Sequence, residues 1–384
     1  MSVSDLADPR PWPAEPAGDA RAADLHLSAQ AAIEASTRRE ADAFDARARG
    51  WLACALRESR GGDLDNALTM VPCAAVARHL RRLLAGVERG DPKSHAHLHT
   101  RLFALPVILV AALEHDAQSV SLAGVIPAPS LAGTLREARA FGGCETFALS
   151  TSLVAADAID IAALPALVSH ASAGPGESAG EFAAAPLDLP PSPIDVESAV
   201  ERVHLRFIAG AVLTPPHVDP LREPGIDRWG MLFAQSMAKA LRAPGVSLLA
   251  LPRPPERLVG AVQTGRAAQR EVSAQLFASN AIRKFRASYG EPTAIISAHR
   301  CAGAPGGGEL RVSLSSPFAA KEAEGFRCPL YPYETVHEVA SMLLALLRDC
   351  RVSDVRVMSG VHADVDRVTA RALFFKDHGA SPLH

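Results

Sequence analysis

The segment TAIISAHRCAGAPGGGELRVSLSS, residues 293–316, decides how the second half of the chain folds. Apolar and polar residues alternate over residues 293–299 and again over residues 309–316, on either side of the glycine-rich stretch 302–308. A period of two is typical of a strand that is buried on one face. Two such strands around a glycine-rich break predict a β-hairpin.

A helix and further strands are predicted after this hairpin. Thr335 and Glu338 form the capping-box pattern T-x-x-E, and an apolar stripe that includes Leu343 follows them. Residues 354–359 alternate like the hairpin strands, and residues 371–376 are predicted as a last strand. The sequence thus predicts a C-terminal β-hairpin–helix–strand module in which the helix covers the apolar face of the sheet.

The preceding sequence also contains helical and extended patterns. Residues 25–58 and 65–88 predict two helices, and Pro72 either kinks the second helix or marks its start. Further strands are predicted at 103–113, 204–213 and 245–252, and further helices at 130–140, 228–241 and 257–289. The fold class is therefore α/β (or α+β): an N-terminal helical hairpin, then a mixed sheet with packed helices, then the C-terminal module.

Four segments are expected along the 384 residues. Residues 1–24 contain four prolines and predict a disordered tail. Residues 25–169 hold the helical hairpin and a small α/β region. Residues 170–193, rich in Gly, Ala, Ser and Pro, are a linker or a long loop, and residues 194–384 form an α/β domain.

Composition bounds the compartment and the partners. The net charge of −3 does not require a polyanionic partner, and the six cysteines contain no Cys-x-x-Cys pair. The acidic, proline-rich start has no signal-peptide pattern, and the longest apolar run, 102–113, is shorter than the about 20 residues that a membrane helix needs. We therefore expect a bacterial, cytoplasmic protein with reduced thiols and no membrane contact.

One face of the C-terminal sheet is predicted to carry the binding residues. Its side chains are Ser297, His299, Arg311, Ser313, Ser315 and Arg356. An antiparallel sheet covered on one side is ordinarily polar on the other, but arginine without lysine is typical of contact surfaces. We expect this face to be covered by another part of the chain, a second subunit or a partner. Ser313→Ala, on this polar face, is expected to cost well under about 1 kcal/mol, as surface changes usually do.

Two other features have a functional and an ordinary interpretation. His95, His97 and His99 alternate, so they lie on one face of a strand and resemble zinc ligands in type, but an exposed histidine cluster without metal is favoured. The predicted helix 257–289 is basic: seven Arg and Lys against two Glu over residues 253–286 give a net charge of +5. Nucleic-acid binding is one interpretation, and a face whose arginines pair with acids elsewhere in the fold is the other.

No catalytic signature decides the function. No G-x-S-x-G elbow is present and no G-x-G-x-x-G follows a strand, so no cofactor is expected. The leading hypothesis is a non-catalytic adaptor or assembly component that acts through a protein partner or self-association. The alternative is a hydrolytic or phosphate-handling enzyme that uses the histidine cluster or the polar sheet face. Nucleic-acid binding through helix 257–289 is the third hypothesis.

Overall fold

The computed structural model divides into two compact units. The larger unit comprises Asp19–Leu68 and His79–Gln269, and the smaller unit comprises Met1–Gly18, Thr69–Arg78 and Arg270–His384. The structure describes residues 20–58, 60, 64–65, 67–68, 73–87, 99–114, 118–142, 146–167, 187, 189–215, 221, 229–316, 324–365 and 371–376. The predicted tail up to residue 19, and residues 170–186 and 188 of the predicted linker, lie outside these ranges.

The N-terminal helices are α1 (Ala20–Glu34), α2 (Arg38–Arg57) and α4 (Ala74–Val87). The single helix predicted over 25–58 is wrong, because the chain begins a new helix at Thr37, whose side chain accepts a hydrogen bond from the backbone of Glu40 in a capping box. Helix α4 begins at Ala74, two positions after Pro72 in the sequence; Pro72 itself is outside the described residues.

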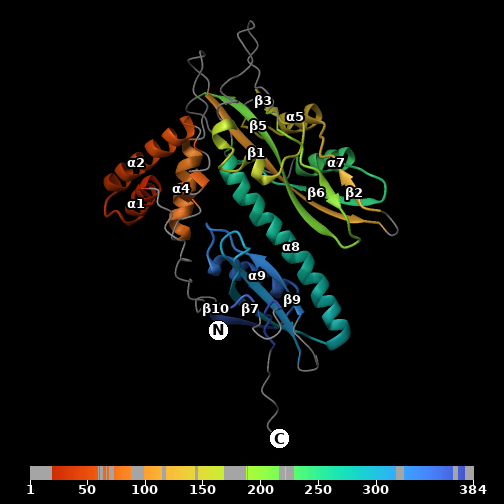
Figure 1. Cartoon of the computed structure of the whole chain (residues 1–384). Helices are drawn as coiled ribbons and strands as arrows, with labels where there is room; N and C mark the ends of the chain where they lie inside the picture. Colours follow the sequence, from red (N-terminus) through yellow and green to blue (C-terminus); the bar gives the residue numbers. More distant parts are fainter. Residues whose placement is uncertain are drawn as a thin grey trace. The chain divides into compact units, whose positions relative to one another are not determined.

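A four-stranded antiparallel sheet is the centre of the larger unit (Figure 1). Its order is β3 (Phe147–Leu149), β5 (Arg202–Thr214), β1 (His99–Leu113) and β6 (Val246–Pro252). Leu105 pairs with Ile208 of β5, and Leu109 pairs with Ala250 of β6. Strand β1 is buried on both faces, as its unbroken apolar sequence predicts.

Helices cover both faces of β1. Alternate residues of β1, from Phe103 to Leu113, join one core cluster with α5 (Ala128–Glu137) and α7 (Gly230–Ala240). On the other face, α8 (Leu258–Tyr289) approaches β5 so closely that a Cβ on Gly265 would lie 3.0 Å from Leu205 and from the Phe207 ring. A separate pair, β2 (Val120–Leu122) with β4 (Ile194–Val196), is antiparallel.

One sheet of the larger unit combines strands from two of the four predicted segments. Strand β1 comes from the predicted segment 25–169, whereas β5 and β6 come from 194–384, and all three pair in one sheet. The division into units falls instead inside helix α8, between Gln269 and Arg270. Antiparallel pairing between strands about a hundred residues apart leaves no composition signal along the chain.

The smaller unit contains the predicted C-terminal module. Its sheet has the order β10 (Asp354–His362), β7 (Thr293–Arg300), β8 (Gly308–Ser315) and β9 (Glu324–Pro329). Strands β7, β8 and β9 are antiparallel, and β10 lies parallel to β7 after helix α9 (Val336–Asp349). The capping box at Thr335 is confirmed, and α9 packs its stripe, including the fully buried Leu343, on the apolar face.

Two details of this module differ from the prediction. Strand β9 was not predicted, although Phe326 and Cys328 alternate with exposed residues along it. Residues 371–376 do not form a strand of the sheet; within them, only Ala372 makes a bridge, to Val365. None of the described helices is long and apolar enough to cross a membrane.

Candidate functional site

The predicted binding face is assembled by β7 and β8 of the smaller unit. Ser297 lies opposite Arg311 in the strand register, His299 lies opposite Glu309, and Ile295 lies opposite Ser313. Five of the six predicted side chains therefore share one face, as the alternation indicated. They are buried, because the face is covered: Ser297, His299, Arg311, Ser313 and Ser315 are each at most 1% exposed.

The sixth predicted residue, Arg356, does not join this group. It lies on β10 opposite Ile295, and its side chain is about half exposed. Its guanidinium is 3.0 Å from the carboxylate of Asp354, and this hydrogen bond holds the pKa of Asp354 below its usual value. Arg356 therefore forms a surface ion pair with Asp354, which precedes it by two residues on the same strand.

The cover is the part of the chain that follows β10. We call residues 363–365 and 371–376 the cover segment. Arg311 donates hydrogen bonds from Nη1 to the carbonyl oxygens of Asp364 and Leu373, and Ser313 Oγ accepts one from the backbone N–H of Phe375 at 3.0 Å. The expectation that something covers this face is confirmed, and the cover is the chain's own C-terminal part.

Arg311 is the centre of a buried ion network. Its Nε lies 2.5 Å from the carboxylate of Glu309, and its Nη2 is ion-paired with the carboxylate of Asp364. A second guanidinium, that of Arg327, lies 3.9 Å from Glu309. Burial of an unpaired charge is strongly unfavourable, so a buried arginine needs such acids around it. The two carboxylates and two guanidinium groups therefore balance one another.

Ser297, His299 and Ala363 form a hydrogen-bonded chain. His299 Nδ1 is 2.8 Å from the carbonyl oxygen of Ala363, and Nε2 is 2.8 Å from Ser297 Oγ. A carbonyl oxygen only accepts, so Nδ1 carries the proton and Nε2 accepts from the serine hydroxyl. Burial, and then the nearby charge of Arg311, lower the pKa of His299, which keeps the ring neutral.

Ser297 and His299 have the geometry of a nucleophile and its base. A serine hydroxyl that donates to a histidine, with the histidine oriented by a third group, is the arrangement used in nucleophilic catalysis. Here both Ser297 and His299 are completely buried. The arrangement instead satisfies buried polar groups and links β7 to the cover segment.

Aromatic side chains complete the cover. The Phe375 ring lies 5.8 Å from the His299 ring and 4.8 Å from the His362 ring. The Arg311 guanidinium lies 5.8 Å from the centre of the Phe374 ring. The same ring packs on Gly325 of β9, where a Cβ would come within 2.8 Å of it. The cover segment thus contacts residues of β7, β8 and β9 through hydrogen bonds, an ion pair and aromatic packing.

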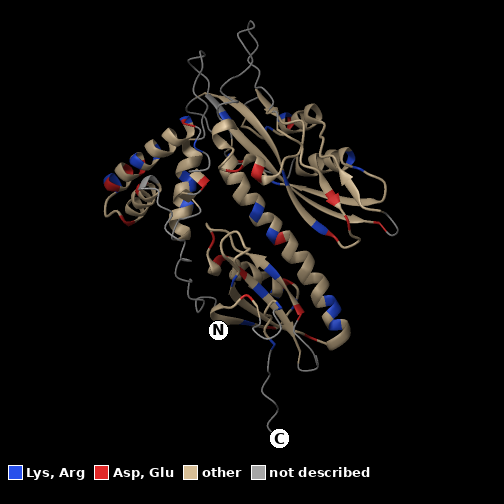
Figure 2. Ribbon diagram, viewed as in Figure 1, with Lys and Arg blue, Asp and Glu red and all other residues tan. Residues whose placement is uncertain are grey.

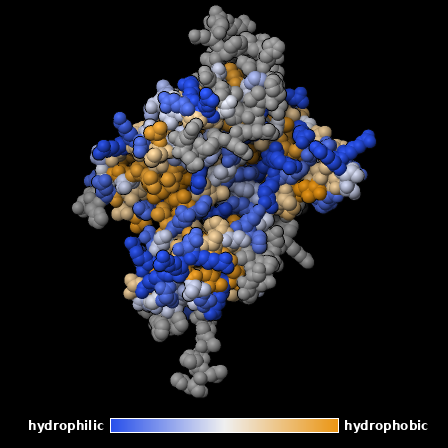
Figure 3. Space-filling model, turned by 180° about the vertical axis from the view of Figure 1, so that it is seen from behind, coloured by the Kyte–Doolittle hydropathy of each residue, from blue (hydrophilic) through white to orange (hydrophobic). Residues whose placement is uncertain are grey.

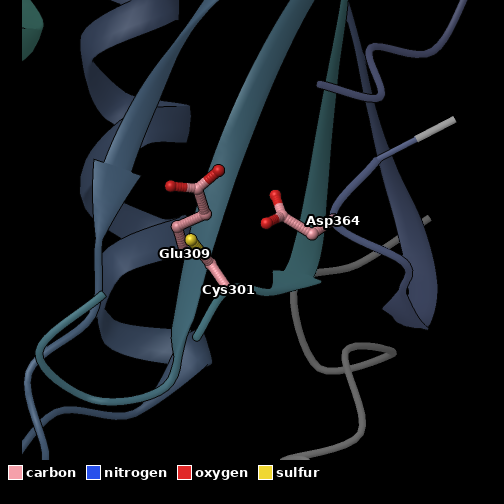
Figure 4. A group of neighbouring side chains, drawn as sticks. All are labelled: Cys301, Glu309 and Asp364. Atoms are coloured by element: carbon pink, nitrogen blue, oxygen red, sulfur yellow. The ribbon is translucent and has the colours of Figure 1, made fainter. Parts of the chain in front are cut away.

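Among the described residues, the side chains of Cys301, Glu309 and Asp364 form a group that could hold a metal ion. Their sulfur and carboxylate oxygens all lie within 4.8 Å of one another, and Figure 4 shows the two carboxylates turned toward each other. Both carboxylates already accept hydrogen bonds from Arg311. The group fits a guanidinium, which supplies the positive charge that a metal ion would otherwise provide.

Sequence reasoning missed Glu309 and Asp364. Glu309 had a signal, because it precedes Arg311 by two residues on a strand and must share its face. Asp364 had none, because its contact with Arg311 spans 53 residues.

The basic helix is mostly paired inside the fold. In the larger unit, Arg257 donates to the carbonyl oxygen of Ala85 at 2.7 Å, and Arg266 lies 3.2 Å from Asp160. In the smaller unit, Arg270 is ion-paired with Glu334. Glu271 is the one acidic residue of α8, and Figure 2 shows basic residues near the C-terminal end of this helix. These contacts support the second interpretation, in which the arginines of this helix pair with other groups of the folded chain.

The histidine cluster falls largely outside the described residues. His95 and His97 lie there, and His99 is the first residue of β1, paired with Thr214. The expectation that this cluster binds no structural metal stays a prediction.

No protein-family model matches this chain, and neither a curated protein nor a solved structure matches it. What the chain does is therefore inferred from its own residues.

Proposed function

We propose that the chain is a non-catalytic cytoplasmic adaptor or assembly protein that acts through protein–protein contacts. The reactive side chains of the polar sheet face support this proposal, because buried contacts within the fold engage them. The five described cysteines also support it, because all of them are free thiols, as is usual in a reducing compartment.

The observation that carries the proposal is the edge of the larger unit's sheet. Strand β6 is the last in the order β3-β5-β1-β6, and in the described part of the chain no strand pairs with its outer side. Glu114 N–H donates to Gly245, and Arg253 N–H donates to Pro106, so the odd-numbered residues of β6 turn their backbone groups toward β1. The backbone groups of Leu248 and Ala250 therefore point outward.

This edge lacks the features that usually prevent strands from associating. Natural edges carry lysine or other charges, or a bulge, and the sequence of β6, VSLLALP, contains no charged residue. Pro252 alone, at its end, limits the strand that can be added. An extended segment of a partner protein would find outward N–H and C=O groups here, which is the mode of strand addition.

Apolar side chains are exposed on both sides of the edge. Leu249, on the sheet face opposite α7, is 54% exposed. On the α7 side, Met231 is 70% exposed and Leu232 is also exposed, and α7 packs on β6. Figure 3 shows hydrophobic residues gathered in patches on the face of the molecule turned away from the view of Figure 1. Apolar residues beside an unpaired edge are typical of a contact surface.

The experiment compares Leu249→Lys with Val200→Lys in the full chain. Both residues are exposed and apolar and lie in the larger unit, but Val200 is outside β6. Proteins that co-purify with the tagged chain from its native cells are identified by mass spectrometry, and self-association is followed by size exclusion. We expect a defined partner, or a second copy, to be lost with Leu249→Lys and kept with Val200→Lys. Identical profiles for both variants and the wild type contradict the proposal.

A further inference from the structure

We infer that the covered face of the C-terminal sheet is a segment-binding site, through which two copies of this chain exchange their cover segments. This site lies in the smaller unit, and the inference does not depend on the edge of β6. The partner is a second copy, because the sequence that fits the face is the chain's own.

The cover segment is held by side chains, as a bound peptide is. Its described β-bridge is internal, between Val365 and Ala372, and Leu373 N–H donates to the carbonyl oxygen of Asp364 at 3.1 Å. The contacts to the sheet come from side chains of β7 and β8, namely those of His299, Arg311 and Ser313. The segment is thus a small unit that closes on itself and docks onto a finished sheet.

The docking contacts are complementary in charge and in shape. Arg311 reaches both arms of the segment, at Asp364 and at Leu373, and its guanidinium pairs with the Asp364 carboxylate. Charge-assisted hydrogen bonds of this kind are stronger than neutral ones and fix the orientation of the partner. The Phe374 ring packs on Gly325, where a Cβ would lie 2.8 Å from the ring and 2.0 Å from the backbone oxygen of Val312.

A hinge precedes the segment. Gly360 has φ +82°, a left-handed conformation that other residues rarely adopt, and the pairing of β10 with β7 shifts register between Val357 and Val361. Val361 and His362 follow Gly360 and still pair with Ala298 and His299 of β7, so a chain that turns differently at Gly360 carries this end of β10 and the segment away from its own sheet. The same contacts then form on a second copy, which is why exchange of identical elements is a low-cost route to a dimer.

Within one chain the segment has the advantage of proximity. A tethered ligand competes at an effective concentration on the order of millimolar. Exchange therefore becomes visible when the contact within the chain is weakened and an intact segment is offered by another copy.

The test mixes two full-length variants. Asp364→Ala leaves the binding face intact and removes the carboxylate of the cover segment. Arg311→Ala leaves the cover segment intact and removes the guanidinium of the face. We expect each variant alone to run largely as a monomer of 40.4 kDa, and the equimolar mixture to give a species of twice that mass by light scattering. Asp354→Ala is the matched control, because Asp354 pairs with Arg356 outside the cover, and its mixture with Arg311→Ala should stay monomeric.

A mixture that stays monomeric, with both variants folded, contradicts the inference, and so does a dimer that forms equally with the Asp354→Ala control. If Arg311→Ala does not fold, a labelled synthetic peptide of residues 363–376 is titrated into the Asp364→Ala chain instead. We expect saturable binding, weakened at least tenfold when the peptide carries the same Asp364→Ala change. No binding, or equal binding of both peptides, to a chain that melts cooperatively overturns the inference.

Discussion

The completely buried guanidinium of Arg311 is ion-paired with the carboxylate of Asp364, 53 residues further along the chain. This pair joins strand β8 to the cover segment and closes the face of the sheet that carries Ser297, His299 and Ser313. It makes that face a contact surface within the fold.

Asp364→Ala should lower the free energy of unfolding by about 1–3 kcal/mol. The carboxylate is 41% exposed, and Arg311 keeps Glu309, so the cost is that of hydrogen bonds to a charged group and less than that of an orphaned buried ion. Asp42→Ala, which removes a surface pair with Arg38, should cost less than about 1 kcal/mol. Urea unfolding of both variants gives the comparison, and equal losses would mean that Asp364 does not anchor the segment.

Ser313→Ala should cost about 1–3 kcal/mol, more than its predicted surface position implied. The side chain is fully buried, and its loss leaves the backbone N–H of Phe375 without its partner. Leu343→Ala, in the core under α9, should cost about 2–5 kcal/mol because it leaves a cavity. Denaturant melts measure both. A cost for Ser313→Ala that is near zero would place the cover segment elsewhere.

The stability of the smaller unit should fall as the pH falls below the ordinary histidine pKa of 6.5. Burial, Arg311 and His362 lower the pKa of His299, although Ala363 and Glu309 act in the opposite direction. The unfolded chain therefore binds the proton more readily, and the stabilisation is complete above pH 6.5 and is lost through the lower folded pKa. His362, whose pKa is also lowered by burial, adds to the effect.

Unfolding free energies measured across pH 5 to 7.5 (about the range in which histidines titrate) test this. His299→Asn should flatten the pH dependence relative to the wild type, whatever its effect on stability at neutral pH. An unchanged slope in His299→Asn would show that other groups carry the dependence.

The thiols should differ in reactivity in the folded protein. Burial raises the pKa of Cys328 to about 12, whereas Cys73 is exposed at the start of α4. The thiolate is the reactive form, so iodoacetamide should modify Cys73 first and Cys328 only after unfolding. Mass spectrometry of peptides over a time course reads this directly. Early modification of Cys328 would mean that β9 is open to solvent.

The sequence was most informative where one local pattern determines the structure. Alternation assigned the two faces of β7 and β8, and the capping box at Thr335 placed the start of α9. The same pattern at Thr37 and Glu40 marks the start of α2, although a single helix was predicted across this position. By contrast, residues 371–376 have a strand-like composition and no strand partner in the sheet, because pairing is decided by distant parts of the chain.

Amide hydrogen exchange of the full chain tests most directly whether the cover segment closes the polar face. We expect slow exchange at Phe375, whose N–H is bonded to Ser313, and faster exchange there in Asp364→Ala but not in Leu249→Lys. Complete exchange of residues 371–376 at the earliest time in the wild type, with the core strands protected, would contradict this expectation.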